Sequence, residues 1–95
     1  MEQQDLNTIA ENWDQKAQGW DLGIGTEGDY NRTTSSDPIL FSYLGDVSDK
    51  VVLDAGCGTG YLGIKIAKQG AKQVFSVDLS PKMVEITKKR IEQSK

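Results

Sequence analysis

The apolar residues near the start of the chain recur at helical spacing. Steps of three or four residues separate the members of one apolar stripe, Leu6, Ile9, Trp13 and Ala17. This spacing predicts a helix over residues 4–18 with Gly19 as its stop. The helix fits either a packing role in the core or a lid over a ligand. Trp13 and Trp20 are likewise interpreted as core or interface residues, with a lid role as the alternative.

Residues 21–36 lack this periodicity and are rich in Gly, Ser, Thr, Asn and Asp, which predicts a loop. Asp37 and Pro38 then have the pattern of a helix N-cap followed by a first-turn proline. The apolar residues after them suit a short helix that ends at Gly45: Ile39, Leu40, Tyr43 and Leu44.

From residue 50 onward, short apolar runs alternate with helical spacing. Val51–Leu53 is typical of a strand buried on both faces, and a glycine-rich turn follows over residues 54–60. The spacing then predicts a helix over residues 61–69, with Gly70 as its end. A second strand is predicted over residues 74–77.

The last predicted helix begins with the same signal as the short one. Ser80 is a candidate N-cap and Pro81 a first-turn proline. The apolar face of this helix is formed by Met83, Val84, Thr87 and Ile91.

The resulting β-α-β-α order predicts an α/β fold with a parallel sheet and helices on its faces. Two strands do not complete such a sheet. We therefore expect the N-terminal half of a doubly wound, Rossmann-like sheet, preceded by a helical N-terminal region. Residues 1–36 are predicted to be a helix and loop that cap the site, and residues 37–95 a truncated Rossmann-like binding domain. A homo-oligomer that completes the truncated sheet is a further expectation.

Composition narrows the function classes. The 95 residues carry a net charge of −3, so we expect no nucleic-acid partner, because phosphate binding needs clustered Lys and Arg. The absence of histidine excludes a Ser-His-Asp triad and a His-based metal site within the chain, and we predict no metal site. The polar start and the lack of a long apolar run predict a cytoplasmic protein with no membrane partner.

The turn Asp54-Ala55-Gly56-Cys57-Gly58-Thr59-Gly60 has the composition of a cofactor-binding loop. Glycines after a strand permit positive φ and close approach of a ligand, and the helix start behind them offers free N–H groups. Cys57 is interpreted as a small loop residue, because no histidine is present to activate it. A dinucleotide site is one alternative, since Gly58, Gly60 and Gly63 match G-x-G-x-x-G and Asp78 follows about twenty residues on.

Two features favour S-adenosylmethionine (SAM) over NAD. The first glycine of the dinucleotide pattern should lie at the tight turn that leaves the strand, and Gly56 holds that place. Asp54 would repel a pyrophosphate but suits the ammonium and sulfonium of SAM, directly or through water. Asp78 can accept hydrogen bonds from both ribose hydroxyls; a helix cap or an ordinary loop acid is its plainer interpretation.

Two stretches resemble the motifs of class I SAM-dependent methyltransferases. Val52-Leu53-Asp54-Ala55-Gly56-Cys57-Gly58-Thr59-Gly60 is similar to the glycine-rich motif I, and Val77-Asp78-Leu79-Ser80-Pro81-Lys82-Met83 to the acidic motif II. The resemblance covers residues 37–93 and implies a seven-stranded sheet, most of which lies outside this chain. It implies that Asp54, Gly56, Cys57 and Gly58 line the methionine moiety, that Asp78 holds the ribose, and that Leu79 and Met83 flank adenine. Met83 fits plain core equally well.

The segment before the short helix adds two candidates. In similar small-molecule methyltransferases such a segment often folds over the methionine end of SAM. We hypothesise that Arg32 pairs with the SAM carboxylate and that Tyr30 borders the methyl-transfer pocket; an exposed arginine in a mobile loop is the alternative. The complete predicted cofactor-binding set is Tyr30, Arg32, Asp54, Ala55, Gly56, Cys57, Gly58, Gly60, Tyr61, Asp78, Leu79 and Met83.

The predicted function of the complete protein is methyl transfer from SAM to a small-molecule acceptor, with S-adenosylhomocysteine as product. No catalytic residue is assigned, and the chain alone is expected to be inactive, because most substrate contacts lie outside it. Two alternatives stay open. One is an NAD(P)-binding oxidoreductase fragment, and the other is a non-catalytic fragment that binds a ligand or oligomerises.

Overall fold

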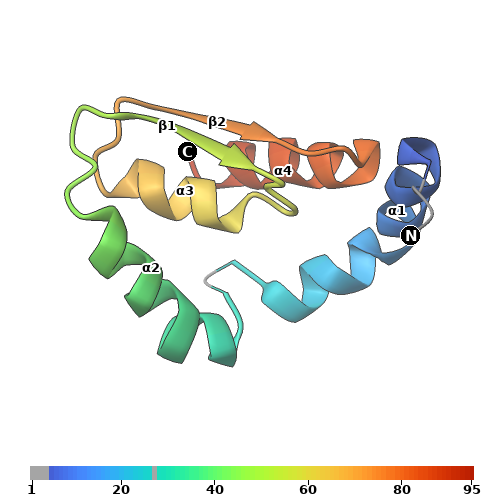
Figure 1. The fold of residues 1–95 in the computed structure, drawn as a ribbon, viewed down its shortest axis with the longest axis horizontal. Helices are drawn as coiled ribbons and strands as arrows, with labels where there is room; N and C mark the ends of the chain where they lie inside the picture. The colour runs from blue at the N-terminus through green and yellow to red at the C-terminus, as the bar shows by residue number, and fades with distance from the viewer. Residues whose placement is uncertain (1–4, 27) are drawn as a thin grey trace.

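The computed structural model describes residues 5–26 and 28–95. Its elements follow the order α1, η1, α2, β1, α3, β2, α4 (Figure 1). The predicted β-α-β-α order after a helical N-terminal region is confirmed. Among the described residues, no helix combines the length and apolar character that a bilayer crossing needs.

Strands β1 (Val51–Ala55) and β2 (Gln73–Val77) pair in parallel, with the register running from Val51 opposite Gln73 to Ala55 opposite Val77. Helices α3 (Tyr61–Lys68) and α4 (Pro81–Gln93) lie on one face of this sheet (Figure 1). A parallel pair of this kind needs a crossover connection, which the turn after β1 and helix α3 supply.

The opposite face of the sheet is open, which corrects the expectation of a strand buried on both faces. Val51 and Leu53 of β1 are 61% and 65% exposed, and Phe75 and Val77 of β2 are 49% and 48% exposed. The β-branched run is apolar enough for burial on both sides, but helices of the described chain cover one side alone.

Helix α1 (Leu6–Ile24) is longer than expected, and residue 4, where the helix was predicted to begin, lies outside the described residues. The prediction that Gly19 stops the helix is wrong, because a glycine on an open helix surface weakens a helix without ending it. The helix ends at Gly25, whose φ is +67° and whose N–H donates to the carbonyl of Asp21.

Contacts in the middle and near the end of α1 hold it against α4. Asp14 accepts hydrogen bonds from the Ser80 hydroxyl and from the backbone N–H of Lys82. Nearer the end of α1, Arg90 Nε lies 2.5 Å from Asp21 Oδ1. These contacts place the long N-terminal helix beside the carboxyl ends of the strands (Figure 1).

The predicted loop over residues 21–36 is mostly helical. After α1, a π-helical segment, η1 (Arg32–Ser36), continues directly into α2 (Asp37–Leu44). Asp37 therefore has helical φ and ψ of −67° and −46°, and the prediction that it is an N-cap is wrong. The predicted stop at Gly45 is confirmed, with φ of +70° and an N–H that donates to the carbonyl of Phe41.

The cap of the last helix is confirmed. The Ser80 hydroxyl accepts from the N–H of Met83, and Pro81 occupies the first turn. Buried apolar side chains from α1, the loop before β1, the glycine turn, α3 and α4 form a small core: Ala17, Ile24, Val47, Cys57, Tyr61, Ile66 and Met83.

Candidate cofactor-binding site

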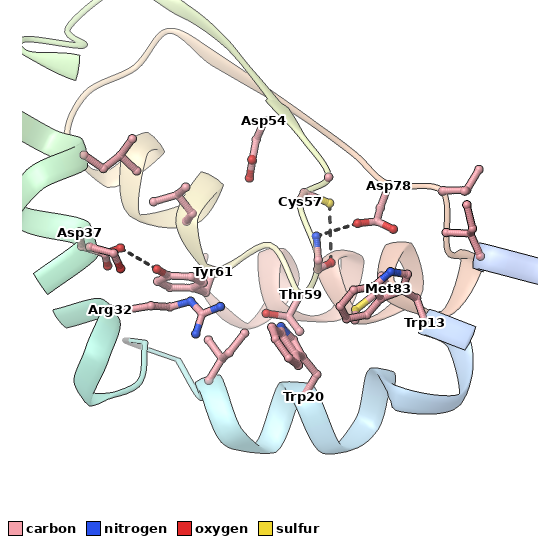
Figure 2. Close-up of a pocket in the computed structure, with 18 residues that line it drawn as sticks. Trp13, Trp20, Arg32, Asp37, Asp54, Cys57, Thr59, Tyr61, Asp78 and Met83 are labelled. Atoms are coloured by element: carbon pink, nitrogen blue, oxygen red, sulfur yellow. Dashed lines mark hydrogen bonds between the residues drawn. The ribbon is translucent and has the colours of Figure 1, made fainter. Parts of the chain in front are cut away.

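A cavity of about 640 Å³ lies at the carboxyl ends of the two strands (Figure 2). Its walls come from α1, from the η1–α2 segment, from the glycine turn after β1 and from the start of α4. This edge of a parallel sheet is where the loops after the strands converge, and it is the usual place for a ligand in an open α/β fold.

The glycines of the turn serve two different purposes. Gly56 and Gly58 have φ of +71° and +58°, and a Cβ at either would meet no atom within 4 Å. A Cβ at Gly60, where φ is +84°, would lie 2.6 Å from Thr87 Cγ2. A Cβ at Gly63 would lie 2.8 Å from Ser76 Oγ. The first two glycines thus leave space beside the backbone, and the other two allow close packing.

This division weakens the dinucleotide interpretation. In a G-x-G-x-x-G fingerprint the second glycine lets the pyrophosphate approach the backbone. Here that position is Gly60, which packs against the Thr87 side chain of α4 and is not among the residues that line the cavity.

Asp78 follows β2 and is held by two backbone donors. The N–H of Gly58 donates to Oδ2 at 2.9 Å, and the N–H of Ser80 donates to Oδ1 at 2.9 Å. The helix-cap interpretation of Asp78 therefore holds in part, because one bond is to the N-cap residue of α4. Each carboxylate oxygen can accept more than one hydrogen bond, so the group remains able to receive a ligand hydroxyl.

Asp54, in β1, differs from Asp78 in the surroundings of its carboxylate. Its Oδ2 atom is buried and has no hydrogen-bond partner among the described residues. Burial, assisted by the negative charge of Asp78, raises the pKa of Asp54 above its ordinary value. A buried acceptor without a partner is costly, so a cation or a donor brought to this atom would relieve that cost.

Arg32 lines the same cavity from η1, with its side chain 28% exposed. Its Nη1 donates to Asp29 Oδ2 at 2.6 Å, and its backbone N–H donates to Asp29 Oδ1. Its guanidinium lies between the rings of Trp20 and Tyr61, and Figure 2 shows it directed toward the interior of the cavity. The arginine therefore occupies an ordered place in the wall.

The remaining predicted site residues divide into two groups. Cys57, Tyr61, Leu79 and Met83 line the cavity along with the residues already described. Tyr30, Ala55 and Gly60 are not among its lining residues. Tyr30 is 79% exposed, because it lies on the solvent side of the helical turn that precedes η1.

The Cys57 thiol is buried, and burial is the main cause that raises its pKa. A thiol with a raised pKa is a poor nucleophile, which agrees with its interpretation as a small loop residue. The described residues contain no cluster of three or more His, Cys, Asp and Glu side chains that could hold a metal ion.

Several lining residues were not in the predicted set. Trp13 and Trp20 of α1 form part of the wall, with ring centroids 5.4 Å apart in a T-shaped arrangement. Thr59 is 1% exposed, and its hydroxyl has no partner among the described residues. Asp37 is 4% exposed and accepts hydrogen bonds from the Tyr61 hydroxyl and from Lys65.

The sequence carried a signal for the tryptophans alone. A lid role is the alternative that the sequence leaves open for both, and Trp13 belongs to the apolar stripe of the predicted helix. The Asp37 contacts join residues 24 and 28 positions apart, and no local pattern announces such a pair.

The residues present fit SAM. An unpartnered anionic oxygen at Asp54 suits the ammonium of the methionine moiety, and the anchored carboxylate of Asp78 suits a ribose diol. The open space beside the backbone at Gly56 and Gly58 leaves room for the part of SAM that joins its ammonium end to its ribose.

Residues 52–95 match the family described as a methyltransferase domain. This range contains both motifs and, except for Val51, the parallel strand pair. It also contains the glycine turn and the residues after β1 that line the cavity. This match and the relatives below support the class I SAM-dependent methyltransferase family, which the two motifs resemble.

Individual proteins similar to the chain are also named as methyltransferases. The ribosomal protein L11 methyltransferase of Psychrobacter sp. is 53% identical over 49 residues, which cover 52% of this chain and 16% of the relative. The ribosomal protein L11 methyltransferase of Ruminiclostridium cellulolyticum is 41% identical over 71 residues, which cover 75% of this chain and 22% of the relative. Protein arginine N-methyltransferase 1 of Saccharomyces cerevisiae is 52% identical over 44 residues, which cover 46% of this chain and 12% of the relative. The chain thus spans less than a quarter of each.

Proposed function

We propose that the protein transfers a methyl group from SAM to a small-molecule acceptor, releasing S-adenosylhomocysteine. The observation that carries the proposal is the pair of carboxylates at the ends of neighbouring strands, both on one cavity of about 640 Å³. One carboxylate, Asp54, has a buried oxygen without a partner, and the other, Asp78, is oriented by two backbone N–H groups.

Each end of the cofactor has a matching group in this proposal. Asp54 pairs with the ammonium, and Arg32 receives the carboxylate with the planar fork of its guanidinium. Asp78 accepts from the ribose hydroxyls, while Leu79 and Met83 flank adenine. Met83 is 2% exposed, so it supports the adenine side from the core.

The N-terminal region, residues 1–36, acts as the cap of this site in the proposal. Ile9, Trp13, Trp20 and Ile24 of α1 all line the cavity and place apolar surface opposite the glycine turn. SAM supplies an electrophilic methyl group on a sulfonium, and the chain's own residues orient the cofactor and exclude water from it.

A binding experiment tests the cofactor. Titration calorimetry of the purified protein should show binding of SAM and S-adenosylhomocysteine, with no binding of NAD. Asp78→Ala should weaken S-adenosylhomocysteine binding by about tenfold or more, because it removes a charge-assisted acceptor for two hydroxyls. Asp49→Asn, at an exposed turn position, is the matched control and should leave binding unchanged.

Two outcomes would replace this proposal. Tight NAD binding without SAM binding would favour the oxidoreductase alternative. Binding of neither would favour a non-catalytic fragment, and the methyl-transfer proposal would be wrong.

The acceptor class needs a separate test. The net negative charge of the chain supports a small-molecule acceptor. The printed names of the relatives, in contrast, refer to a ribosomal protein and to arginine in a protein. The full-length protein that contains these residues is incubated with methyl-labelled SAM and a cell extract, and the label above that of extract without the protein is divided by molecular mass. Label in the low-mass fraction supports the proposal, and label in protein alone contradicts it.

A further inference from the structure

Arg32 is held by aromatic rings from two different helices. Its guanidinium carbon lies 5.6 Å from the centroid of the Trp20 ring of α1 and 5.8 Å from that of the Tyr61 ring of α3. Cations within about 6 Å of an aromatic face are attracted to it. Trp20 is in turn braced by the edge-to-face contact with Trp13, at a centroid distance of 5.4 Å.

The Tyr61 ring is fixed from its far end. Its hydroxyl donates to Asp37 Oδ1 at 2.8 Å, and Asp37 Oδ2 accepts from Lys65 Nζ at 3.1 Å. Burial is the first cause that raises the pKa of Tyr61 far above its ordinary value, with the nearby Asp37 acting in the same direction. The phenol therefore stays protonated and remains a donor to Asp37.

A third contact, with Asp29, orients the guanidinium of Arg32. Nη1 donates to Asp29 Oδ2, which uses one edge of the planar group. A guanidinium has five N–H donors, so an ion pair of this kind still leaves donors for a second carboxylate. Figure 2 shows the group beside Tyr61 and directed toward the cavity that Asp54 also faces.

We propose that Trp20 and Tyr61 form an aromatic clamp that positions Arg32, and that the clamp makes the site select cofactor molecules that carry a free α-carboxylate. The inference rests on the proposed binding of SAM and deepens it. Tyr61 and Trp20 are positioning residues in this proposal, and Arg32 is the group that touches the ligand. Without the clamp, the long side chain loses its direction into the cavity and binds the carboxylate weakly.

The test compares two ligands that differ in one group. S-adenosylhomocysteine has the amine and the carboxylate, whereas S-adenosyl-3-thiopropylamine keeps the adenosine, the thioether and the amine but lacks the carboxylate. The purified protein should bind the first about tenfold or more tightly than the second in calorimetric titrations. Arg32→Ala should remove most of this preference.

Tyr61→Leu and Trp20→Leu should each lower affinity for S-adenosylhomocysteine by about 3- to 30-fold, as expected for a lost cation–π contact. Because both residues also line the cavity, affinity for the decarboxylated ligand should fall as well, but by a clearly smaller factor. Tyr61→Phe keeps the ring and should retain more of the preference than Tyr61→Leu does. Tyr43→Leu, at a side chain that is 86% exposed, is the matched control and should change neither affinity.

The outcomes separate the clamp from the proposed function. If either leucine variant weakens both ligands equally, the residue has a general structural role and the clamp is wrong. If the unaltered protein binds neither ligand, the SAM proposal itself fails. Should Tyr61→Leu not fold, Trp20→Leu, at a residue 41% exposed on the opposite side of the guanidinium, decides the question.

Discussion

At the scale of single residues, the site is defined by the contrast between its two carboxylates. Asp78 is satisfied by the backbone N–H groups of Gly58 and Ser80, whereas Asp54 keeps a buried oxygen with no partner in the described residues. Burial thus disfavours the ionised form of Asp54 and raises its pKa. A buried polar group left unpaired costs stability, and such costs are characteristic of binding sites.

The raised pKa of Asp54 predicts a pH dependence for both stability and binding. Because the folded state disfavours the carboxylate, its destabilising effect is present above the raised pKa and is relieved as pH falls through it. Affinity for the ligand ammonium changes in the opposite direction, since protonation removes the anion. Binding of S-adenosylhomocysteine should therefore weaken at a higher pH than an ordinary aspartate would cause, as calorimetry across pH 4–7 would measure.

Asp54→Asn separates the two effects. It should raise the melting temperature at pH 7 and lower affinity for S-adenosylhomocysteine by about 10- to 100-fold, the value of a charge-assisted contact. The weakening of binding that protonation of Asp54 causes should be absent in the variant. An unchanged affinity would show that Asp54 does not meet the ammonium.

Gly60 provides a prediction about stability. Alanine there combines a positive φ of +84° with a Cβ only 2.6 Å from Thr87 Cγ2. Thr87 is buried and its hydroxyl donates to the carbonyl of Gly58, so it cannot easily move. Gly60→Ala should lower the free energy of unfolding by about 2–4 kcal/mol in urea titrations.

Gly58→Ala is the matched comparison. It has a positive φ but an open surrounding, so it should lower the free energy of unfolding by only about 1 kcal/mol. Its Cβ would enter the space proposed for the cofactor, so S-adenosylhomocysteine affinity should fall more than stability does. If both alanines destabilised equally, the packing role of Gly60 would be wrong.

At the scale of elements, α1 and α4 act as one unit. Asp14 bonds to the start of α4, and Arg90, near its end, pairs with Asp21 and donates to Thr26. Because α1 carries the two tryptophans of the cavity wall, loosening this contact should affect the ligand as well as the fold.

Arg90→Ala should therefore reduce both stability and binding. Arg90 and Asp21 side chains are 14% and 25% exposed, so loss of this partly buried pair should cost about 1–2 kcal/mol of unfolding free energy. S-adenosylhomocysteine affinity should fall a few-fold. Lys89→Ala is the control, since Lys89 is 72% exposed and its pair with Glu85 spans 3.8 Å. Equal effects of the two substitutions would show that the Arg90 pair does not hold α1.

Elements set by local sequence were the ones that could be predicted. Both strands, α4 and its Ser80 cap follow from short-range spacing and turn chemistry. The N-cap prediction for Asp37 fails because the following Pro38 is typical of a helix start, whereas the partners of the Asp37 side chain come from α3. Likewise, the sequence indicated the cofactor loop, but Arg32 acquires its place from rings on α1 and α3 that only the fold brings together.

At the scale of the whole molecule, the described chain is less compact than its length suggests. Its radius of gyration is 14.0 Å, and a compact domain of this length would have about 12 Å. The two-stranded sheet leaves one apolar face exposed, on which Leu53 and Phe75 are directly opposite each other. The relatives are several times longer than the matched part, so their chains have length available to cover such a face.

The polypeptide of residues 1–95 is accordingly expected to self-associate through this face. A fully buried Leu or Phe side chain contributes about 1.5–3 kcal/mol, so Leu53→Thr with Phe75→Thr should weaken association by about tenfold or more. Threonine suits a strand, so the pairing should persist. Sedimentation velocity over a range of concentrations measures the change, and Tyr43→Thr on the exposed side of α2 is the control.

Measuring S-adenosylhomocysteine binding distinguishes the exposed sheet face from the proposed cofactor site. The exposed face and the cavity lie on different parts of the sheet, because the cavity opens at the carboxyl ends of the strands and not over the face that Leu53 and Phe75 share. The double threonine variant should therefore bind S-adenosylhomocysteine as the unaltered chain does. A chain that stays monomeric at high concentration would contradict the oligomer prediction, and loss of binding in the double variant would show that the sheet face and the cavity are coupled.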